Sequence, residues 1–311
     1  MKIVIMGAGA LGSLFGGLLS FSGEEVWLVD VRKENVDLIN AVGVTMEREG
    51  KIQIVGATAT TDPSSIGKAD LVMLMVKTYH TEQAVSDALA VQDESTVFLT
   101  LQNGLGNEEA ICKKVDRKKV MVGVTGHGAT LLGPGHILHA GKGKTYLGVL
   151  DPSLEDRARE IARAFQEAEI ETEVTSTIEE HIWNKLFANV GINPLTALTD
   201  MKNGELLDHP ETLRLVEALV KEAVEVAKKK GIRVEGDPVQ RTKEVAEATR
   251  KNRSSMGQDF DYRRQTEIDA INGALVREAE RLGVAVPVNQ AITDLVKVIQ
   301  KQFSAPGELK F

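Results

Sequence analysis

The sequence predicts an α/β protein in which an N-terminal, Rossmann-type doubly wound sheet is followed by an all-helical C-terminal domain. Short apolar strands alternate with helices over the first half of the chain, which is typical of a parallel sheet with helices on both faces. From residue 177 onwards only helical periodicity is present, interrupted by Gly and Pro. A chain of 311 residues is long enough for two domains. We therefore expect a Rossmann domain at 1–176 and a helical domain at 177–311.

The first domain begins with a strand, a glycine-rich turn, a helix and a second strand. Residues 2–6 and 26–30 are apolar runs of strand length, and residues 10–21 are small and apolar. The alternation at 44–55 predicts a hairpin that turns at Glu49-Gly50. Further strands are predicted at 70–76, 96–101, 120–125 and 171–175, antiparallel strands within 123–148, and helices at 33–42, 81–90, 106–115 and 154–168.

The second domain is predicted to contain helices alone. Residues 212–227 keep an apolar stripe at i, i+3, i+4 and i+7 and end in three lysines and Gly231, as expected at a helix C-terminus. The same periodicity predicts helices at 181–198, 238–250, 259–282 and 287–303.

Composition excludes several classes of protein. A net charge of −8 and a pI near 5.4 argue against nucleic acid or an anionic membrane as the main partner. The single cysteine, Cys112, excludes an internal disulfide and a cysteine-based zinc site. No signal peptide is visible and no apolar run approaches membrane-spanning length, so we expect a cytoplasmic protein.

The glycine-rich turn predicts a nucleotide site. Gly7, Gly9 and Gly12 stand between a predicted strand and a predicted helix in the spacing GxGxxG. The first glycine permits the tight turn, the second lets the backbone approach a pyrophosphate, and the third lets helix and strand pack closely. The helix N-terminus then offers backbone amides and a positive dipole end to the phosphates. We therefore expect a bound dinucleotide.

The next strand ends in residues that give conflicting indications about the nucleotide. Asp30 follows Gly12 by eighteen residues, and an acid there accepts hydrogen bonds from the ribose hydroxyls and repels a 2′-phosphate, which favours NAD(H). Arg32 and Lys33 follow at once, and a cation nearby suits NADP(H). Alternatively, both are solvated charges at the start of a helix.

The helix at 181–198 carries a polar stripe although apolar residues occur nearly all round it. Lys185, Asn189 and Asn193 stand at i, i+4 and i+8 and so share one face. Because an unpaired buried amide is costly, we expect this face to line a polar cleft, the alternative being a narrow solvent-facing stripe. Pro194 is expected to bend or break the helix just after Asn193.

A second polar cluster lies at 252–275. Ser254 and Ser255 precede a predicted helix, where a capping role is the simple interpretation. Glu267 is expected on the core-facing side of that helix, because it shares a face with Ile271 and Leu275. A buried carboxylate needs a partner, and Lys185 is a candidate. The alternative is a first-turn glutamate that favours the helix dipole.

These segments together resemble the ketopantoate reductase family over essentially the whole chain. The resemblance rests on GAGALG (7–12), on the stretches that contain Lys77, Asn103 and His127, and on three further blocks, WNKLFANVGINPL, NRSSMGQD and TEIDAING, in the family's order and spacing. It implies NADPH-linked reduction of 2-dehydropantoate to pantoate, on the route to pantothenate and coenzyme A.

The resemblance also implies roles for individual residues. Lys185 corresponds to the general acid, Glu267 to the carboxylate beside it, and Asn189, Asn193 and Ser255 to the groups that hold the substrate. The implied cofactor contacts are Gly7, Gly9, Ala10, Leu11, Gly12, Asp30, Arg32, Lys77, Asn103, His127 and Glu267, with Asn103 at the junction of nicotinamide and substrate. From the residues alone, Lys77 and His127 fit equally well as a solvated lysine and a hydrogen-bonded loop histidine.

Two positions depart from the family pattern. Family members that use NADPH often have a small residue where this chain has Asp30, so both NADP(H) and NAD(H) remain candidates. Gly257 stands where a larger apolar residue is usual, which keeps open a reductase of another 2-keto acid or of an imine. A non-catalytic NAD(P)-binding sensor is the alternative from another class. The expected partner is a small 2-keto acid, and the long amphipathic helices are compatible with a homodimer.

Overall fold

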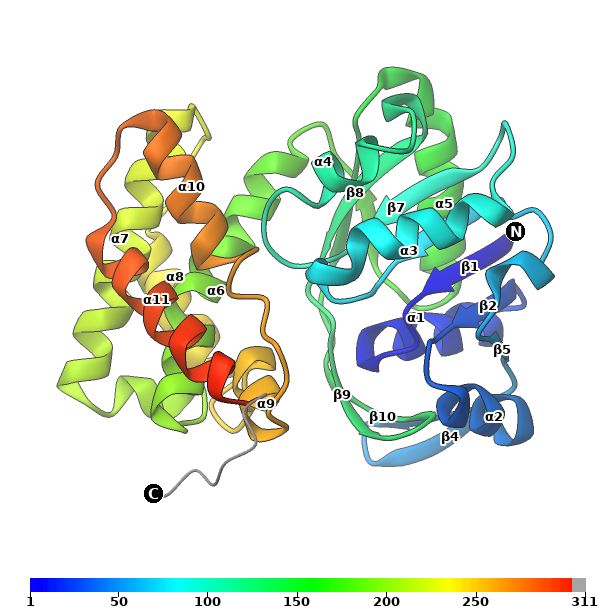
Figure 1. Cartoon of the computed structure of the whole chain (residues 1–311), viewed down its shortest axis with the longest axis horizontal. Helices are drawn as coiled ribbons and strands as arrows, with labels where there is room; N and C mark the ends of the chain where they lie inside the picture. Colours follow the sequence, from blue (N-terminus) through cyan, green and yellow to red (C-terminus); the bar gives the residue numbers. More distant parts are fainter. Residues whose placement is uncertain (304–311) are drawn as a thin grey trace. The chain divides into compact units, whose positions relative to one another are not determined.

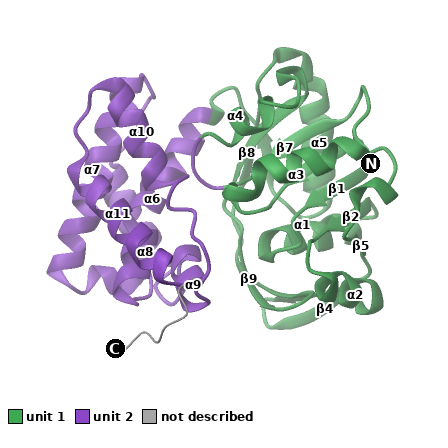
Figure 2. Ribbon diagram, viewed as in Figure 1, with its two compact units in different colours: residues 1–102, 106–178 green, residues 103–105, 179–311 purple. Residues whose placement is uncertain are grey.

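The computed structural model describes residues 1–303, so 304–311, the end of the expected helical domain, lie outside the described residues. The chain forms two compact units (Figure 2). Unit 1 comprises Met1–Gln102 and Gly106–Ile178, and unit 2 comprises Asn103–Leu105 and Glu179–Phe311.

Unit 1 is built on an eight-stranded sheet with the order β12-β11-β8-β7-β6-β1-β2-β5 (Figure 1). The strands from β8 to β5 in this order pair in parallel, and β11 pairs antiparallel with β8. The strands are β1 (Lys2–Met6), β2 (Glu25–Val29), β5 (Thr58–Thr60), β6 (Leu71–Leu74), β7 (Val97–Thr100), β8 (Val120–Thr125), β11 (Thr145–Val149) and β12 (Thr172–Val174).

Helices cover both faces of this sheet, which confirms the predicted doubly wound class. Along β1, Ile3 and Ile5 enter one hydrophobic core while Val4 and Met6 enter another, because successive side chains of a strand point to opposite faces. The first core contains residues of α1 and α5, and the second contains residues of α3 and α4. The helices of unit 1 are α1 (Ala10–Phe21), α2 (Lys33–Val42), α3 (Thr81–Ala88), α4 (Asn107–Cys112) and α5 (Glu155–Glu167).

A second, four-stranded sheet of unit 1 joins two hairpins that lie far apart in the sequence. Its order is β4-β3-β10-β9, formed by β3 (Val44–Arg48), β4 (Lys51–Val55), β9 (Gly128–Gly133) and β10 (His136–Gly141). The predicted turn at Glu49-Gly50 is confirmed, with φ of 49° and 75°, as a two-residue hairpin turn with two left-handed residues requires. The parallel pairing of β3 with β10 was not expected from the sequence.

The described residues of unit 2 form helices joined by turns and loops, without strands. Its α-helices are α6 (Ile178–Thr199, whose first residue belongs to unit 1), α7 (Pro210–Lys230), α8 (Pro238–Ala248), α9 (Ser255–Asp261), α10 (Asn272–Leu282) and α11 (Pro287–Gln302). Helix α6 supplies Trp183, Phe187 and Val190 to a core shared with α7, α10 and α11. Among residues 1–303 no helix is both long and apolar enough to cross a membrane.

The structure departs from the predicted helices at two places. The expected helix at 259–282 is interrupted, because α9 ends where Arg263 takes a left-handed conformation (φ 51°) and α10 begins only at Asn272. Glu267 therefore lies in a turn that precedes α10, and the helix-face argument for it fails. Of the expected bend or break at Pro194, the break does not occur, since α6 continues through this residue to Thr199. A bend at this residue stays a prediction.

Unit 1 contains a pair of histidines close to α1, of which His127 is buried and His139 half-buried. His127, which follows β8, is 6% exposed, and its Nδ1 lies 3.0 Å from Nε2 of His139 on β10. The two rings stack with centroids 5.1 Å apart, and the His127 ring also meets the ring of Phe15. Burial, followed by the nearby His139, lowers the pKa of His127 to about 4. Burial also lowers the pKa of His139, so both rings are neutral at pH 7 and one donates its N–H to the other.

This pair predicts a loss of stability in mild acid. In the unfolded chain His127 takes up a proton below its ordinary pKa of 6.5, but in the folded protein it does so only near pH 4. The free energy of unfolding should thus fall as pH drops from 6.5 to 4, by about 3 kcal/mol from this residue. Urea unfolding of the wild type and His127→Gln across this range measures the effect. An equally steep loss in the variant would show that other groups are responsible.

Candidate active site

The glycine-rich turn after β1 has the geometry of a nucleotide cradle. Gly7 has a φ of 109°, and a Cβ there would lie 2.8 Å from the backbone nitrogen of Val76, so only glycine fits. A Cβ on Gly12 would lie 1.9 Å from the carbonyl oxygen of Gly7. A Cβ on Gly9 would meet open space, which leaves room for a ligand at the N-terminus of α1. Ala10 and Leu11 form the start of that helix, so this edge of unit 1 fits a pyrophosphate.

Asp30 follows β2 and is 7% exposed. Its carboxylate accepts hydrogen bonds from Arg32 through the backbone N–H (2.9 Å), Nε (3.1 Å) and Nη2 (2.8 Å), and from Nδ2 of Asn35 (2.8 Å). The hydrogen bond to Asp30 raises the pKa of the Arg32 guanidinium. A carboxylate offers about four acceptor positions, so these donors saturate Asp30. A ribose hydroxyl must therefore displace one of them, and the half-exposed Arg32 side chain is the one most easily moved.

Asn35, on α2, is a residue that sequence reasoning missed. It is 1% exposed, and its Nδ2 donates to the carbonyl oxygen of Ala8 (3.1 Å) as well as to Asp30. Its Oδ1 accepts from the backbone N–H of Gly135 (2.8 Å). The Asn35 side chain thus connects three segments by hydrogen bonds: the glycine-rich turn, Asp30 after β2, and the β9–β10 hairpin. An asparagine in the first turn of a helix is ordinary, so the sequence offers no signal for this role.

Lys77 and His127 stand after strands of the same sheet. Lys77 follows β6 and precedes a short 3₁₀ helix (Thr78–His80), with its side chain partly exposed. The His127 side chain packs against His139 and Phe15 instead of standing open to solvent. The hydrogen-bonded loop histidine considered above therefore describes its side chain, and a cofactor contact from residue 127 remains a prediction.

In unit 2, α6 places Lys185, Asn189 and Asn193 on one face, as the spacing predicts. Asn193 is buried, whereas Lys185 and Asn189 keep part of their surface exposed. Burial of the ammonium lowers the pKa of Lys185 to about 8, although the charge of Glu267 acts in the opposite direction. A lysine with a pKa near 8 is protonated at neutral pH and able to lose its proton, as a general acid must be.

Glu267 is 7% exposed and lies close enough to Lys185 to act on its charge. The turn that carries it is closed by bonds from the backbone N–H groups of Ala270 and Ile271 to its carbonyl oxygen. Residues Asn103–Leu105 group with this turn, because the N–H of Leu105 donates to the carbonyl of Ala270 (2.9 Å). Unit 2 therefore brings the segment containing Asn103 to the turn containing Glu267.

At the start of α9 the structure distinguishes the two serines. Ser254 is the buried N-cap, and its Oγ accepts from the N–H of Gly257 (2.9 Å) and lies 2.6 Å from the hydroxyl of Thr196 on α6. Thr196 in turn donates to the carbonyl of Asn193 (3.0 Å). Ser255 is exposed at the first position of α9. The capping interpretation is confirmed for Ser254, and a substrate contact for Ser255 remains a prediction.

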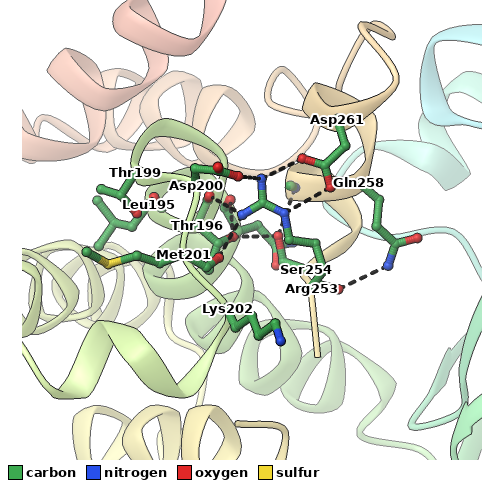
Figure 3. Close-up of polar contacts among 12 residues, drawn as sticks. Leu195, Thr196, Thr199, Asp200, Met201, Lys202, Arg253, Ser254, Gln258 and Asp261 are labelled. Carbon is green, nitrogen blue, oxygen red and sulfur yellow. Dashed lines mark hydrogen bonds and ion pairs between the residues drawn. The ribbon is translucent and has the colours of Figure 1, made fainter. Parts of the chain in front are cut away.

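Arg253 fixes the end of α6 to α9 (Figure 3). Its Nη1 donates to the carbonyls of Thr196 and Met201, while Nε and Nη2 pair with Asp261. A Cβ on Gly257 would lie 2.8 Å from Nε of Arg253. A larger residue at position 257 would therefore require the Arg253 side chain to shift.

Comparisons with known proteins show which family the chain is similar to. The family model described as "Ketopantoate reductase PanE/ApbA" matches residues 3–152, and its C-terminal counterpart matches residues 177–300. A 2-dehydropantoate 2-reductase of Halobacterium salinarum is 38% identical over 302 residues, which cover 97% of this chain and 99% of the relative.

Solved structures agree. A PanE/ApbA family ketopantoate reductase from Ralstonia eutropha superposes with a TM-score of 0.90 at 30% identity, covering 98% of this chain and 100% of the other. A D-mandelate dehydrogenase with NADH and anilino(oxo)acetate gives a TM-score of 0.92 at 30% identity, with the same coverage. Matching in both halves and along its whole length, the chain belongs to the ketopantoate reductase family.

Proposed function

We propose that this protein is an NAD(P)H-dependent 2-dehydropantoate 2-reductase that forms pantoate for pantothenate and coenzyme A synthesis, with Lys185 as its general acid. The observation that carries the proposal is a lysine on the polar stripe of an otherwise apolar helix, with its pKa lowered to about 8 and a buried carboxylate, Glu267, acting on its charge. Family membership supports the substrate, because the curated relatives at 36–38% identity carry that name.

The chemistry needs a proton where negative charge develops. The dihydronicotinamide, when bound, supplies a hydride to the keto carbon. The C=O electron pair moves onto the oxygen, and Lys185 donates a proton from Nζ to that oxygen, which leaves a neutral amine and a hydroxyl group. Until that moment the ammonium also stabilises the developing charge, more strongly than it would in water. Glu267 favours the protonated form of Lys185 and so keeps the acid loaded near neutral pH.

The remaining polar groups of unit 2 suit a small hydroxylated keto acid. Asn189, Asn193 and Ser255 would orient the substrate through neutral donors and acceptors that add no charge beside the lysine. Asn103 would stand where nicotinamide and substrate meet. A sensor that only binds nucleotide has no use for a lysine of lowered pKa, so these residues favour an enzyme.

The glycine turn of unit 1 fits a nicotinamide dinucleotide. Gly7, Gly9, Ala10, Leu11 and Gly12 would hold the pyrophosphate, and Asp30 the adenosine ribose. Arg32 would bind a 2′-phosphate only after leaving Asp30. Because the Asp30 carboxylate repels a 2′-phosphate, this site favours NADH, although the family resemblance favours NADPH. Lys77 and the backbone at 127 would contact the nicotinamide half.

A second candidate is a reductase of another 2-keto acid. Gly257 alters the serine block, and the likeness to a D-mandelate dehydrogenase is as strong as that to a ketopantoate reductase. The two candidates are separated by following nicotinamide absorbance with NADH and NADPH against a panel of branched and aromatic 2-keto acids. The proposal expects 2-dehydropantoate to give the highest kcat/KM, and a clear preference for another acid would overturn it.

Lys185→Ala should lower kcat by about 10²–10⁴-fold, the usual contribution of a positioned general acid. Steady-state kinetics with 2-dehydropantoate measure the change, and nucleotide binding followed by fluorescence should be unaffected. Lys221→Ala, which removes an exposed lysine of α7, serves as the matched control. Unchanged turnover in Lys185→Ala would rule out the assignment.

Asp30→Ala should weaken the preference for NADH over NADPH, because it removes the group that repels a 2′-phosphate and frees Arg32. The measurement is the ratio of kcat/KM for the two nucleotides. Arg32→Ala is the opposing control and should lower activity with NADPH more than with NADH. Equal ratios in wild type and Asp30→Ala would show that Asp30 has a structural role only.

A further inference from the structure

Helix α6 contains a proline that should disturb it at the candidate site. Pro194 has no backbone N–H, so the carbonyl of Val190, four residues earlier, loses its helical hydrogen bond, and the proline ring crowds that carbonyl. Val190 is buried, and a buried carbonyl without a partner is costly. Nevertheless α6 continues without interruption to Thr199.

The missing hydrogen bond is replaced from another helix. Asn272, the first residue of α10, is fully buried, and its Nδ2 donates to the carbonyl of Val190 at 3.2 Å. The same Nδ2 donates its second hydrogen to Oδ1 of Asn289 at 3.0 Å. Within residues 1–303, Oδ1 of Asn272 is buried without a hydrogen-bond partner. The fold thus tolerates an unsatisfied acceptor in order to keep both donors of Asn272 in place.

Asn289 is itself held rigidly. It is fully buried at the start of α11, and its Nδ2 donates to the carbonyl of Leu219 (3.1 Å) and to Oε2 of Glu222 (2.8 Å), both on α7. Glu222 also accepts the backbone N–H groups of Val288 and Asn289 at 2.9 Å each, which satisfies the N-terminus of α11. Every side-chain N–H of the two asparagines is therefore used, in a relay from Glu222 through Asn289 and Asn272 to Val190.

The relay ends inside the polar stripe. Val190 follows Asn189 directly, and Asn193 directly precedes Pro194. Lys185, Asn189 and Asn193 keep a common face only while this stretch of α6 stays regular. A kink at Pro194 would turn Asn193 away from the other two, and misplacements of about 1 Å can cost up to about 10²-fold in rate.

We infer that Asn272, held by Asn289 and Glu222, is a positioning residue of the reductase. Its side-chain amide takes the place of the backbone N–H that Pro194 lacks, and so keeps Asn193 in line with Asn189 and Lys185. This inference rests on the proposed function for the part played by the stripe, and on the hydrogen-bond distances for the relay itself.

The test exploits the proline. Asn272→Ala should lower kcat/KM for 2-dehydropantoate by about 10–100-fold, mainly through KM, and leave KM for the nucleotide within about twofold. Pro194→Ala restores an N–H four residues after Val190, so Asn272 is no longer needed. The double variant Asn272→Ala/Pro194→Ala should therefore regain the activity of Pro194→Ala alone. A double variant as impaired as Asn272→Ala would overturn the inference, as would a fully active Asn272→Ala.

A control variant, a fallback variant and a hydrogen-exchange measurement complete the test. Asn203→Ala removes another buried asparagine of unit 2 that donates to Thr249, and its effects should not be relieved by Pro194→Ala. If Asn272→Ala does not fold, Asn272→Ser, which keeps one donor, replaces it, with the same rescue expected. Amide hydrogen exchange of residues 189–197 tests the relay independently of enzyme activity. Exchange should be faster in the Asn272 variant than in the wild type, and slower again when Pro194→Ala is added. A wild type inactive on 2-dehydropantoate would refute the proposed function, whereas unchanged exchange would refute the relay.

Discussion

The candidate site in the helical unit depends on one electrostatic interaction, that between the buried ammonium of Lys185 and the carboxylate of Glu267. Burial lowers the pKa of Lys185 to about 8, and Glu267 acts against that change. An isolated buried charge costs several kcal/mol, so the carboxylate is needed to keep the lysine protonated in the folded protein. Too strong a partner would hold the proton too firmly for transfer. Under the proposed function, the balance between burial and Glu267 would determine how readily Lys185 donates its proton.

Several hydrogen bonds surround the C-terminal half of α6. Asn193 lies on a helix that supplies several apolar residues to the core, and polar groups near it form hydrogen bonds within α6 and with neighbouring segments. The hydroxyl of Thr196 donates to the carbonyl of Asn193 and forms a hydrogen bond with the hydroxyl of Ser254. Arg253 donates to the Thr196 carbonyl near the end of the helix, and Asn272 donates to the carbonyl of Val190. Because Arg253, Ser254 and Asn272 all lie outside α6, the orientation of the polar stripe depends on how these segments pack against that helix.

Local rules predicted much of the fold and of the candidate site. The glycine turn and the Glu49-Gly50 hairpin are governed by nearby residues, and the Lys185 stripe by helical period. The features that could not be predicted from the sequence depend on contacts between residues that lie far apart along the chain. The pairing of β3 with β10 joins segments about ninety residues apart. The helix interruption before Glu267 is not marked by a glycine in the sequence. The role of Asn272 can be recognised only from the three-dimensional structure, which shows its side chain beside the Val190 carbonyl that Pro194 leaves without a helical hydrogen bond.

The most direct test of this account is the pH dependence of kcat/KM for 2-dehydropantoate in the wild type and in Glu267→Gln. The wild type should lose activity about tenfold per pH unit above a midpoint near 8, as Lys185 gives up its proton in the free enzyme. Because Glu267 raises the pKa of Lys185, the midpoint should move to lower pH in Glu267→Gln. A wild-type profile that stays flat through the alkaline range, or a midpoint unmoved by the substitution, would contradict it.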